Sequence, residues 1–379
     1  SLFYINRESS LAVNLEKLKS LAYLDYTEET QDTSLSGVTI YNEDLTYDGY
    51  NLVDGKYIVD MQGNTLVILP GEGNLHLLFD DGTMFDGSWG TNESLLSKFD
   101  ENFNLIWEKN ISFHHDLRIS ENNTFWTIAR EKRKYKGRWV VFDTITKISE
   151  AGEVLDKWST YENLKEIQRF HYKSDLENPL FFFSKVLFKE VDNLDEFDYY
   201  HINSIQELSE TVLGEIDDRF QKGNLLLSLF HTSIMIILDK DTKKIVWAWG
   251  LDNLEGQHMP TLLENGNILV FDNGGKDREF SRVLELNPIT EEIVWEYTGE
   301  PIESFYTESM GSAQRLPNGN TLITESEEGR LIEVTRDKEI IWEYYFPYYD
   351  QENKRETIYR AFRVEKERID KLMKIWNIK

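Results

Sequence analysis

The chain has 379 residues and carries 68 acidic against 41 basic side chains, a formal net charge of −27 at pH 7. This balance argues against nucleic-acid binding, which requires clustered Lys and Arg to neutralise phosphates. The absence of cysteine removes disulfides, thiolate catalysis and cysteine-ligated metals, and no apolar run is long enough to span a membrane.

The first element expected in chain order is a short amphipathic helix over residues 10–22. From about residue 49 the chain alternates between two kinds of hairpin. One kind has an Asn-Gly or similar turn between apolar runs, which favours a tight hairpin because both turn residues readily adopt positive φ. The other kind has a polar turn and mostly ends in tryptophan. Segments of the first kind are 70–80, 119–129, 262–272 and 315–326, and those of the second are 99–109, 148–158, 238–249, 286–297 and 334–344.

Two hairpins form a unit of about 45 residues with four antiparallel strands, a repeat typical of β-propellers. We therefore predict an all-β fold, a six-bladed β-propeller of four-stranded antiparallel blades. The tryptophans are interpreted as core residues that pack between blades. The blades are expected at 70–109, 114–158, 201–249, 258–297 and 310–344, with the sixth formed by 49–69 and the late strand 357–364, which closes the ring.

The expected organisation has three parts and one insertion. An N-terminal helical or extended segment covers residues 1–36, the propeller covers 37–365, and a C-terminal helix covers 366–379. The insertion lies near residues 159–200, in the one long gap between repeats.

Three histidines recur at the start of the strands that should line the central channel. His258 lies seven residues before Asn265, and His115 lies seven before Asn122. His201 opens the corresponding strand of the blade between them. We expect the three imidazoles to occupy the same position in three blades and to meet near the axis, at one mouth of the channel.

Such a set has two chemical readings at this point. Three imidazoles can bind a metal such as zinc with an open coordination position, or they can form an anion pocket with one nucleophilic histidine. A Ser/His/Asp triad and a phosphate-binding loop have no supporting motif. The other histidines lack the spacing and are assigned structural or surface roles, with His231 as the exception discussed below: His76, His114 and His171.

Several segments together resemble the arylsulfotransferase family, bacterial six-bladed propellers that move sulfate between phenols without an adenylylated donor. The resemblance extends from about residue 37 to 365 and is most specific over 256–335. The segments are "GVTIYNEDLTYDGYNLV" (37–53), "HHDLRISENNT" (114–124), "DYYHINSI" (198–205), "GQHMPTLLENGNILVFDNGG" (256–275), "SRVLELNPITEEIVWEY" (281–297) and "GSAQRLPNGNTLITESEEGRLIEVT" (311–335).

The resemblance implies roles for particular residues. The nucleophilic histidine of the family falls on His258, its supporting histidines fall on His115 and His201, and its asparagine falls on Asn203. The sequence departs from the family at two places. Phe230 or His231 replaces the anion-binding arginine, and Met259 replaces a frequent aspartate. Candidates to replace the arginine are His231, Arg360 and Arg278.

The resemblance thus implies transfer of a sulfuryl group from an aryl sulfate to a phenolic acceptor through a sulfohistidine, with no cofactor and no metal. Two alternatives remain: a non-catalytic propeller that binds a ligand or partner at the same mouth, and a metal-dependent hydrolase. The expected partners are a small-molecule aryl sulfate and a phenol, with no nucleic acid. Because the family is typically exported and the chain begins at Ser1 without methionine, we expect a periplasmic or extracellular protein whose N-terminal signal or anchor has been removed.

Overall fold

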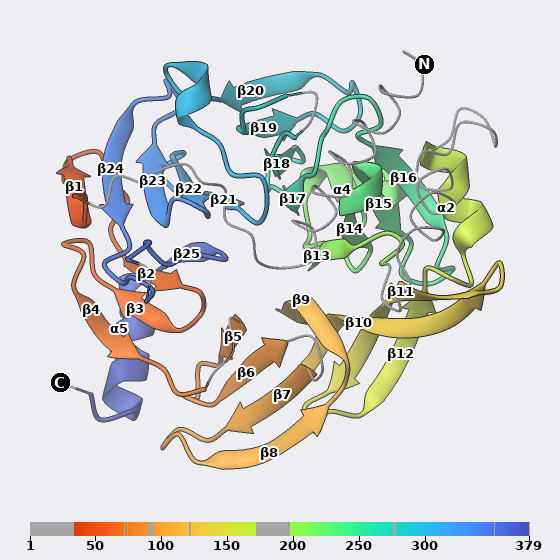
Figure 1. Ribbon diagram of the computed structural model, residues 1–379, viewed down its shortest axis with the longest axis horizontal. Coiled ribbons are helices and arrows are strands. Elements are labelled where there is room, and N and C mark those ends of the chain that lie inside the picture. Colours follow the sequence, from red (N-terminus) through yellow and green to blue (C-terminus); the bar gives the residue numbers. More distant parts are fainter. Residues whose placement is uncertain are drawn as a thin grey trace, which may run out of the picture. The chain divides into compact units, whose positions relative to one another are not determined.

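Six antiparallel β-sheets form a ring in the computed structural model (Figure 1). The structure describes residues 34–71, 73, 75–89, 94–120, 123–171, 198–275, 278–351 and 353–378. The helix expected over residues 10–22 and most of the insertion near 159–200 lie outside these residues. The prediction of a six-bladed β-propeller with four-stranded antiparallel blades is confirmed.

In blades 2 to 6 the four strands follow one another outward, and the first strand lies nearest the centre of the ring (Figure 1). Blade 2 comprises β5 (Leu75–Leu78), β6 (Met84–Trp89), β7 (Ser94–Phe99) and β8 (Leu105–Asn110). Blade 3 comprises β9 (Phe113–Ile119), β10 (Thr124–Tyr135), β11 (Arg138–Ser149) and β12 (Val154–Ser159). Blade 4 comprises β13 (Ile202–Glu207), β14 (Leu225–Leu229), β15 (Ile234–Leu238) and β16 (Ile245–Trp249). Blade 5 comprises β17 (His258–Leu262), β18 (Ile268–Asp272), β19 (Arg282–Leu286) and β20 (Ile293–Tyr297). Blade 6 comprises β21 (Ser312–Arg315), β22 (Thr321–Glu325), β23 (Arg330–Val334) and β24 (Ile340–Tyr345).

Blade 1 joins the two ends of the propeller and closes the ring. Its innermost strand is the late β25 (Ala361–Val364), which pairs antiparallel with β2 (Tyr50–Val53). The outer strands β3 (Tyr57–Val59) and β4 (Thr65–Ile68) complete the sheet. One pairing was not predicted: β1 (Gly37–Tyr41) adds a fifth strand to the outer edge of blade 6, beside β24.

The tryptophans of the outer strands connect neighbouring blades. The indole nitrogen of Trp247 in blade 4 donates to the carbonyl of Pro288 in blade 5 at 3.1 Å. Trp295 in blade 5 donates to Arg336 O in blade 6 at 2.9 Å. The indole nitrogen of Trp342 in blade 6 donates to the Met61 carbonyl in blade 1 at 2.9 Å. These side chains are buried in apolar clusters that each span two adjacent blades, so the tryptophans bind the ring together, as core residues.

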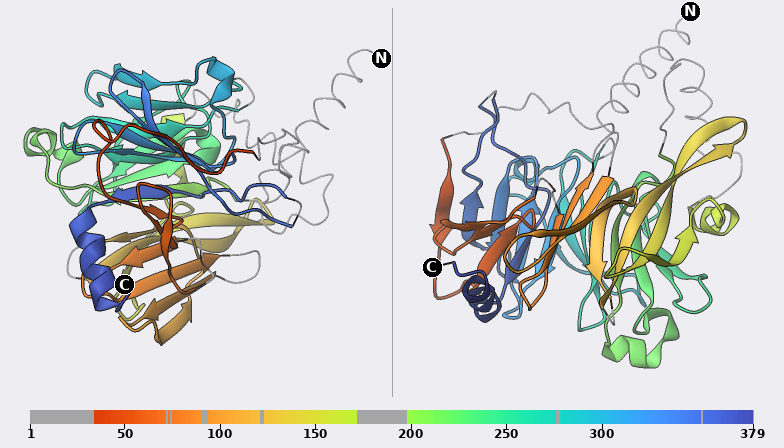
Figure 2. Two further views of the ribbon diagram at one scale, coloured as in Figure 1. Left: turned by 90° about the vertical axis from the view of Figure 1, so that its left-hand side faces the viewer. Right: turned by 90° about the horizontal axis from the view of Figure 1, so that it is seen from below.

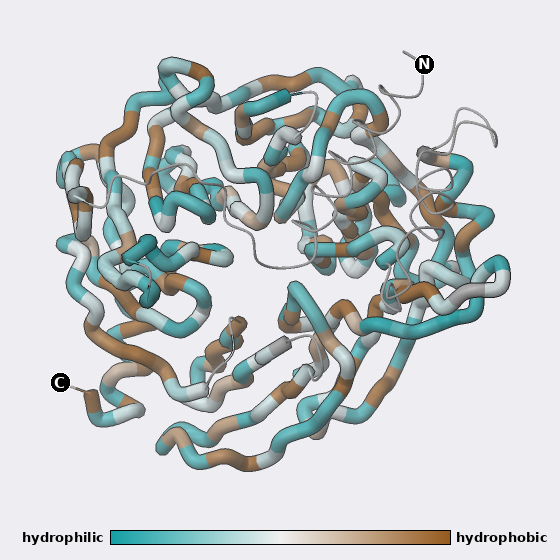
Figure 3. Tube along the Cα trace, viewed as in Figure 1, coloured by the Kyte–Doolittle hydropathy of each residue, from teal (hydrophilic) through white to brown (hydrophobic). Residues whose placement is uncertain are grey.

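Most of the hydrophobic residues lie on the strands, while the turns are hydrophilic (Figure 3). Helix α5 (Lys366–Ile375) buries Ile369 and Leu372 against blades 1 and 2 (Figure 2). None of the helices in the described residues has the length and apolarity needed to cross a membrane. The structure also describes the helical segments α2 (Leu164–His171), α4 (Val212–Ile216) and the 3₁₀ turns η2 (Asp218–Phe220), η3 (Phe230–Thr232) and η4 (Ile302–Ser304).

Blade 3 differs from the others in the length of its central hairpin. Strands β10 and β11 have 12 residues each, and only part of each is paired with β9 or β12. The remainder projects beyond its blade (Figure 2, right) and is strongly hydrophilic in β10 (Figure 3). This hairpin begins beside the histidines described next.

Candidate active site

Histidines from three blades gather near the centre of the ring. The ring centroids of His115 and His201 are 4.6 Å apart. Phe230 lies between His201 and His258, with its centroid 5.5 Å from the first and 5.3 Å from the second. His115 and His258 are buried, and the charge of each neighbouring imidazole affects the pKa of the next. Side chains far apart in the sequence therefore form one cluster.

The three histidines reach the cluster from different positions on their strands, contrary to the shared position predicted. His258 pairs with Phe271, and the residue at the same point of the blade 3 ladder is His114, which pairs with Ile128. His201 comes just before the first residue of β13, and its carbonyl accepts a hydrogen bond from Phe230 N at 3.2 Å. The seven-residue offsets in the sequence do not show these differences, because a β-bulge shifts the pairing register of each of the three inner strands.

The bulges also redirect side chains toward the centre. The blade 3 ladder skips His115 and Asp116, and the blade 5 ladder shifts between His258 and Thr261. His115 has φ of 59° and Met259 has φ of 52°, both in the left-handed region that L-residues seldom occupy. A bulge re-aims the residues around it and commonly occurs beside functional sites.

The surroundings of His258 determine which ring nitrogen carries its proton. Its Nδ1 lies 2.7 Å from Asn273 Oδ1 and 3.1 Å from the Gly256 carbonyl. The Asn273 amide nitrogen donates to two carbonyls, at 2.9 and 2.8 Å, which fixes the amide orientation and leaves its oxygen to accept. Nδ1 must therefore be the protonated nitrogen, and Nε2 keeps its lone pair.

Burial lowers the pKa of His258 to about 3, and it outweighs the opposing effect of the hydrogen bond that His258 donates to Asn273. The charges of His201 and Arg360 lower this pKa further. His258 is thus neutral at physiological pH. A neutral imidazole with a free Nε2 is a competent nucleophile.

Tyr359 fixes the proton of His115 in a similar way. Its hydroxyl lies 3.0 Å from the His115 carbonyl, 3.0 Å from Arg360 Nη2 and 3.1 Å from His115 Nδ1. The carbonyl can only accept and the guanidinium can only donate, so the hydroxyl proton goes to the carbonyl and Nδ1 donates to the hydroxyl. Burial, with the charges of His201 and His114, places the pKa of His115 well below its ordinary value.

His201 is oriented by a carboxylate. Its Nδ1 lies 3.1 Å from Asp198 Oδ2, and its backbone N–H donates to the other oxygen at 3.1 Å. Burial raises the pKa of Asp198, but the hydrogen bond from His201 and the nearby imidazoles outweigh it, so the pKa lies below its ordinary value. Asp198 is therefore ionised, and His201 Nδ1 carries the proton. All three histidines of the cluster are thus held through Nδ1.

Two further histidines adjoin the cluster. The ring of His114 is 4.8 Å from that of His115, and the ring of His231 is 5.1 Å from that of His201. His114 Nε2 lies 3.0 Å from Asp143 Oδ1, but the two groups are not aligned for a hydrogen bond. The structural or surface role predicted for His114 therefore omitted its place beside the cluster.

Two guanidinium groups bring positive charge to the other side of the cluster and share one buried carboxylate. Arg360 Nη1 donates to Asp116 at 2.7 Å, and Arg118 Nε donates to the same carboxylate at 3.2 Å. Arg360 Nη2 also reaches the His115 carbonyl at 3.2 Å. Arg118 extends to Met259 Sδ at 3.0 Å, beside His258. Two cations against one anion leave a local positive charge in a strongly acidic protein.

The other predicted site residues are only partly brought together. Asn203 donates to the Gln257 carbonyl at 2.9 Å, next to His258, and its own oxygen is buried with no hydrogen-bond partner among the described residues. His231 Nδ1 contacts the Asp198 carbonyl at 3.0 Å. Arg278 instead pairs with Asp272 at 2.7 Å and donates to the Phe280 carbonyl, and none of its described contacts reaches a histidine.

Sequence reasoning missed Asn273, Tyr359, Asp198, Asp116 and Arg118. Asn273 follows the second strand of its hairpin within "FDNGG", and Tyr359 adjoins a predicted arginine. Their positions gave a weak signal, since a polar residue at a strand end is common. Their roles depend on partners in other strands or blades.

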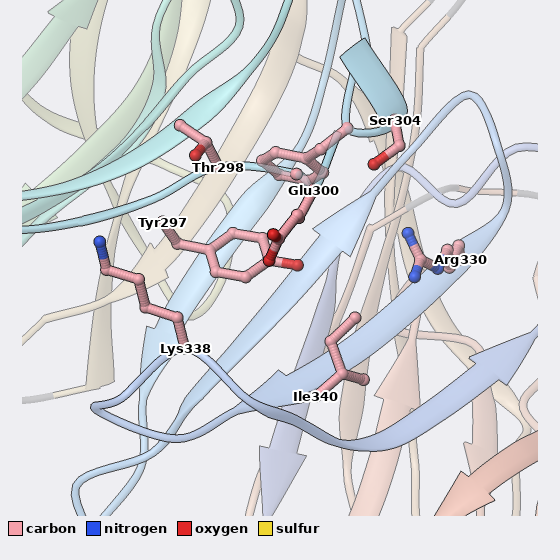
Figure 4. Close-up of a pocket in the computed structure, with 9 residues that line it drawn as sticks. Tyr297, Thr298, Glu300, Ser304, Arg330, Lys338 and Ile340 are labelled. Carbon is pink, nitrogen blue, oxygen red and sulfur yellow. The ribbon is translucent and has the colours of Figure 1, made fainter. Parts of the chain in front are cut away.

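A metal-binding cluster and a surface hollow are two further candidates for a site. Among the described residues, no three His, Asp or Glu side chains are arranged to hold a metal ion. A hollow between β20 and the strands of blade 6 is lined by Tyr297, Glu300, Arg330 and Lys338 (Figure 4). Arg330 is already paired with Glu325 and Glu343, and no histidine lines this hollow, so we place the candidate site at the histidine cluster.

The chain is similar to one known family and, more distantly, to several solved structures. The sequence matches the family model described as arylsulfotransferase (ASST) over residues 68–347. No curated protein matches it significantly. Similar solved structures include a protein of unknown function from Bacteroides caccae, with 15 % identity, a TM-score of 0.47, and coverage of 83 % of this chain and 98 % of that one. Virginiamycin B lyase from Staphylococcus aureus has 12 % identity, a TM-score of 0.41, and coverage of 72 % and 69 %. At these values the likenesses carry no functional information.

Proposed function

The chain belongs to the arylsulfotransferase family, and from that premise we propose that it transfers a sulfuryl group from an aryl sulfate to a phenol through a sulfohistidine at His258. The observation that carries the proposal is the environment of His258. Asn273 Oδ1 holds Nδ1 at 2.7 Å, and burial keeps the ring neutral by lowering its pKa to about 3. A buried structural histidine has no need of a free Nε2, whereas a nucleophile does.

In the first step, His258 Nε2 attacks the sulfur of the aryl sulfate. An N–S bond forms, the bond between sulfur and the aryl oxygen breaks, and the electron pair leaves with the phenolate. A proton from His201 neutralises that phenolate as it departs. His201 is favoured for this role, because the carboxylate of Asp198 stands 3.1 Å from its Nδ1 and can stabilise the ring in its protonated form.

In the second step, an acceptor phenol gives its proton back to the same imidazole, and its oxygen attacks the sulfur. The N–S bond breaks, His258 regains its lone pair, and the acceptor leaves as an aryl sulfate. The covalent intermediate divides one difficult displacement into two easier ones. No proton, electron or cofactor is left over at the end of the cycle.

Charge on the sulfuryl oxygens requires fixed donors in both steps. Arg360 contributes through its charge: it is almost fully buried and acts on His258, although its terminal N–H groups already bond Asp116, Tyr359 and the His115 carbonyl. The side chains of His115 and Asn203 flank the same region. We propose that these groups replace water around the anion. They also offset the repulsion that a chain of net charge −27 exerts on an anionic substrate.

The proposal is tested with 4-nitrophenyl sulfate as donor and a phenol as acceptor. The wild-type protein should release nitrophenol and show a sulfuryl adduct on His258 by peptide mass analysis, and His258→Ala should show neither. Added imidazole should restore part of the release in the variant. His76→Ala is the matched control, since His76 is a buried histidine in blade 2 outside the cluster, and this variant should remain active if its melting temperature shows that it is folded.

A second function is favoured by one observation, the ring of Phe230 between His201 and His258. An aromatic side chain cannot donate to sulfate oxygens, so the site could bind an aromatic ligand without transferring a group. Saturable binding of the aryl sulfate, with no nitrophenol release and no adduct in the wild type, would favour this binding function over transfer.

A further inference from the structure

Arg130 lies in β10 at the base of the projecting hairpin, and its charge acts on Asp143 without forming an ion pair among the described residues. Among the described residues, its guanidinium makes no hydrogen bond and no ion pair, and its Nε is buried and unsatisfied. A buried donor without a partner is costly, and native structures seldom retain one without a reason. The group is therefore available to a ligand.

The backbone places Arg130 beside the histidine cluster. Arg130 is directly opposite Asp143 in the β10–β11 ladder, so the two side chains leave the same face of the sheet. One carboxylate oxygen of Asp143 accepts from Ile202 N at 3.0 Å, and the other lies 3.0 Å from His114 Nε2 without a hydrogen bond. Burial raises the pKa of Asp143, and the charge of Arg130 opposes that rise. The charge of Arg130 accordingly contributes to lowering the pKa of both His114 and His115, after burial.

The other guanidinium groups of the site are already occupied. Arg118 and Arg360 share the carboxylate of Asp116, on the side of the cluster nearer His258. Arg130 lies near His114 and His115, and in the part of the chain that the structure describes no carboxylate is hydrogen-bonded to it. Phe230, which faces His201, offers no donor. Arg130 is therefore the guanidinium group from which we expect hydrogen bonds to an anion bound among His115, His201 and His258.

We propose that Arg130 is an anion clamp that binds two sulfuryl oxygens of the donor through its paired N–H groups. This inference deepens the proposed function and rests on it for the identity of the ligand. The planar guanidinium suits this task because its parallel N–H groups match the spacing of oxygens on a sulfuryl group. Arg130, in blade 3, thereby supplies the positive charge that is missing at the position of Phe230 in blade 4.

The hairpin carrying Arg130 strengthens the local field. The exposed side chains of Lys132, Lys134 and Lys136 continue along the same projecting segment, which Figure 3 shows as strongly hydrophilic. Positive charge on one side of a pocket raises the local concentration of an anion. In a chain of net charge −27, such a concentration of lysine and arginine directs an anionic substrate to one face.

The test is equilibrium binding of 4-nitrophenyl sulfate, measured by calorimetry in the His258→Ala background so that no turnover interferes. Arg130→Ala should weaken binding roughly 10- to 100-fold, the loss expected for charge-assisted hydrogen bonds. Arg130→Lys keeps the charge but not the paired donors and should fall between the two. Because the guanidinium has no partner within the described residues, the melting temperature should change little.

The matched control is Arg133→Ala, three residues along the same strand. Arg133 pairs with Glu131 at 2.7 Å and is partly exposed, so its removal should leave binding close to that of the parent. Equal binding by Arg130→Ala and its parent, or equal losses in both alanine variants, would overturn the clamp. Binding that depends on Arg130 in a protein with no transfer activity would retain the clamp and refute the sulfotransferase proposal.

Discussion

Among single residues, His258 depends most on its surroundings for its proposed chemistry. Because burial lowers its pKa to about 3, roughly nine-tenths of the ring is still neutral at pH 4, where an ordinary imidazole is almost wholly protonated. Formation of the sulfuryl adduct should therefore persist as the pH falls from 8 to about 4. Rapid quenching followed by intact-mass measurement checks this, with tryptophan fluorescence to confirm folding at each pH. Loss of the adduct with a midpoint near 6.5 would contradict it.

The residues that create this environment illustrate what spacing can and cannot predict. His258 was singled out from its seven-residue offset to Asn265, a feature contained within one hairpin. Asn273 was not, because its role depends on carbonyls at residues 307 and 310 that hold its amide. Arg130 was not predicted either, since its importance lies in the partners that it lacks. Contacts between distant segments, and their absence, leave no local pattern in a sequence.

At the scale of elements, the closing strand β25 connects ring closure to the site. Asp54, after β2, accepts from the backbone N–H groups of Tyr359 at 2.7 Å and Arg360 at 3.3 Å. These two residues are the ones that hold His115 and the buried carboxylate of Asp116. The segment that closes the propeller therefore also positions part of its centre.

Asp54→Ala should for this reason impair stability and activity together. Two backbone donors would lose their acceptor, at a cost of about 2 kcal/mol, and Arg360 would be less firmly placed, which should raise KM for the aryl sulfate. Asp54→Asn should remain close to the wild type, because it keeps an acceptor oxygen and because burial already raises the pKa of Asp54 to about 7. Urea unfolding and steady-state kinetics measure both effects. An alanine variant as stable as the asparagine variant would show that Asp54 does not secure the closure.

The blades were predictable because each one repeats a turn and an aromatic-ended strand, and both signals are local. The β-bulges were not, because one or two extra residues in a ladder leave the spacing of apolar residues almost unchanged. That shift sets His114, rather than His115, opposite Ile128. The pairing of β1 with β24 in blade 6 was not predicted, because the sequence of a strand does not show which distant strand it pairs with.

For the whole molecule, the distribution of charge poses the main physical difficulty. The net charge of −27 repels an anionic donor at long range, while Arg130, Arg360 and Arg118 attract it at short range. Exposed charges are screened within about 10 Å at 0.1 M salt, whereas buried groups are screened far less. Added salt should thus weaken the repulsion more than the attraction.

We therefore expect kcat/KM for 4-nitrophenyl sulfate to rise a few-fold between 10 and 150 mM sodium chloride, over which the Debye length falls from about 30 to 8 Å. The value for a neutral phenol acceptor should hardly change, because the charge of the protein exerts no net force on it. Stopped-flow measurements of adduct formation at several salt concentrations distinguish the effect on the donor from that on the acceptor. Replacing chloride by acetate controls for competition between anions. A steep fall for the donor would mean that exposed positive charge, such as the lysines of the β10–β11 hairpin, outweighs the acidic remainder during the approach to the site.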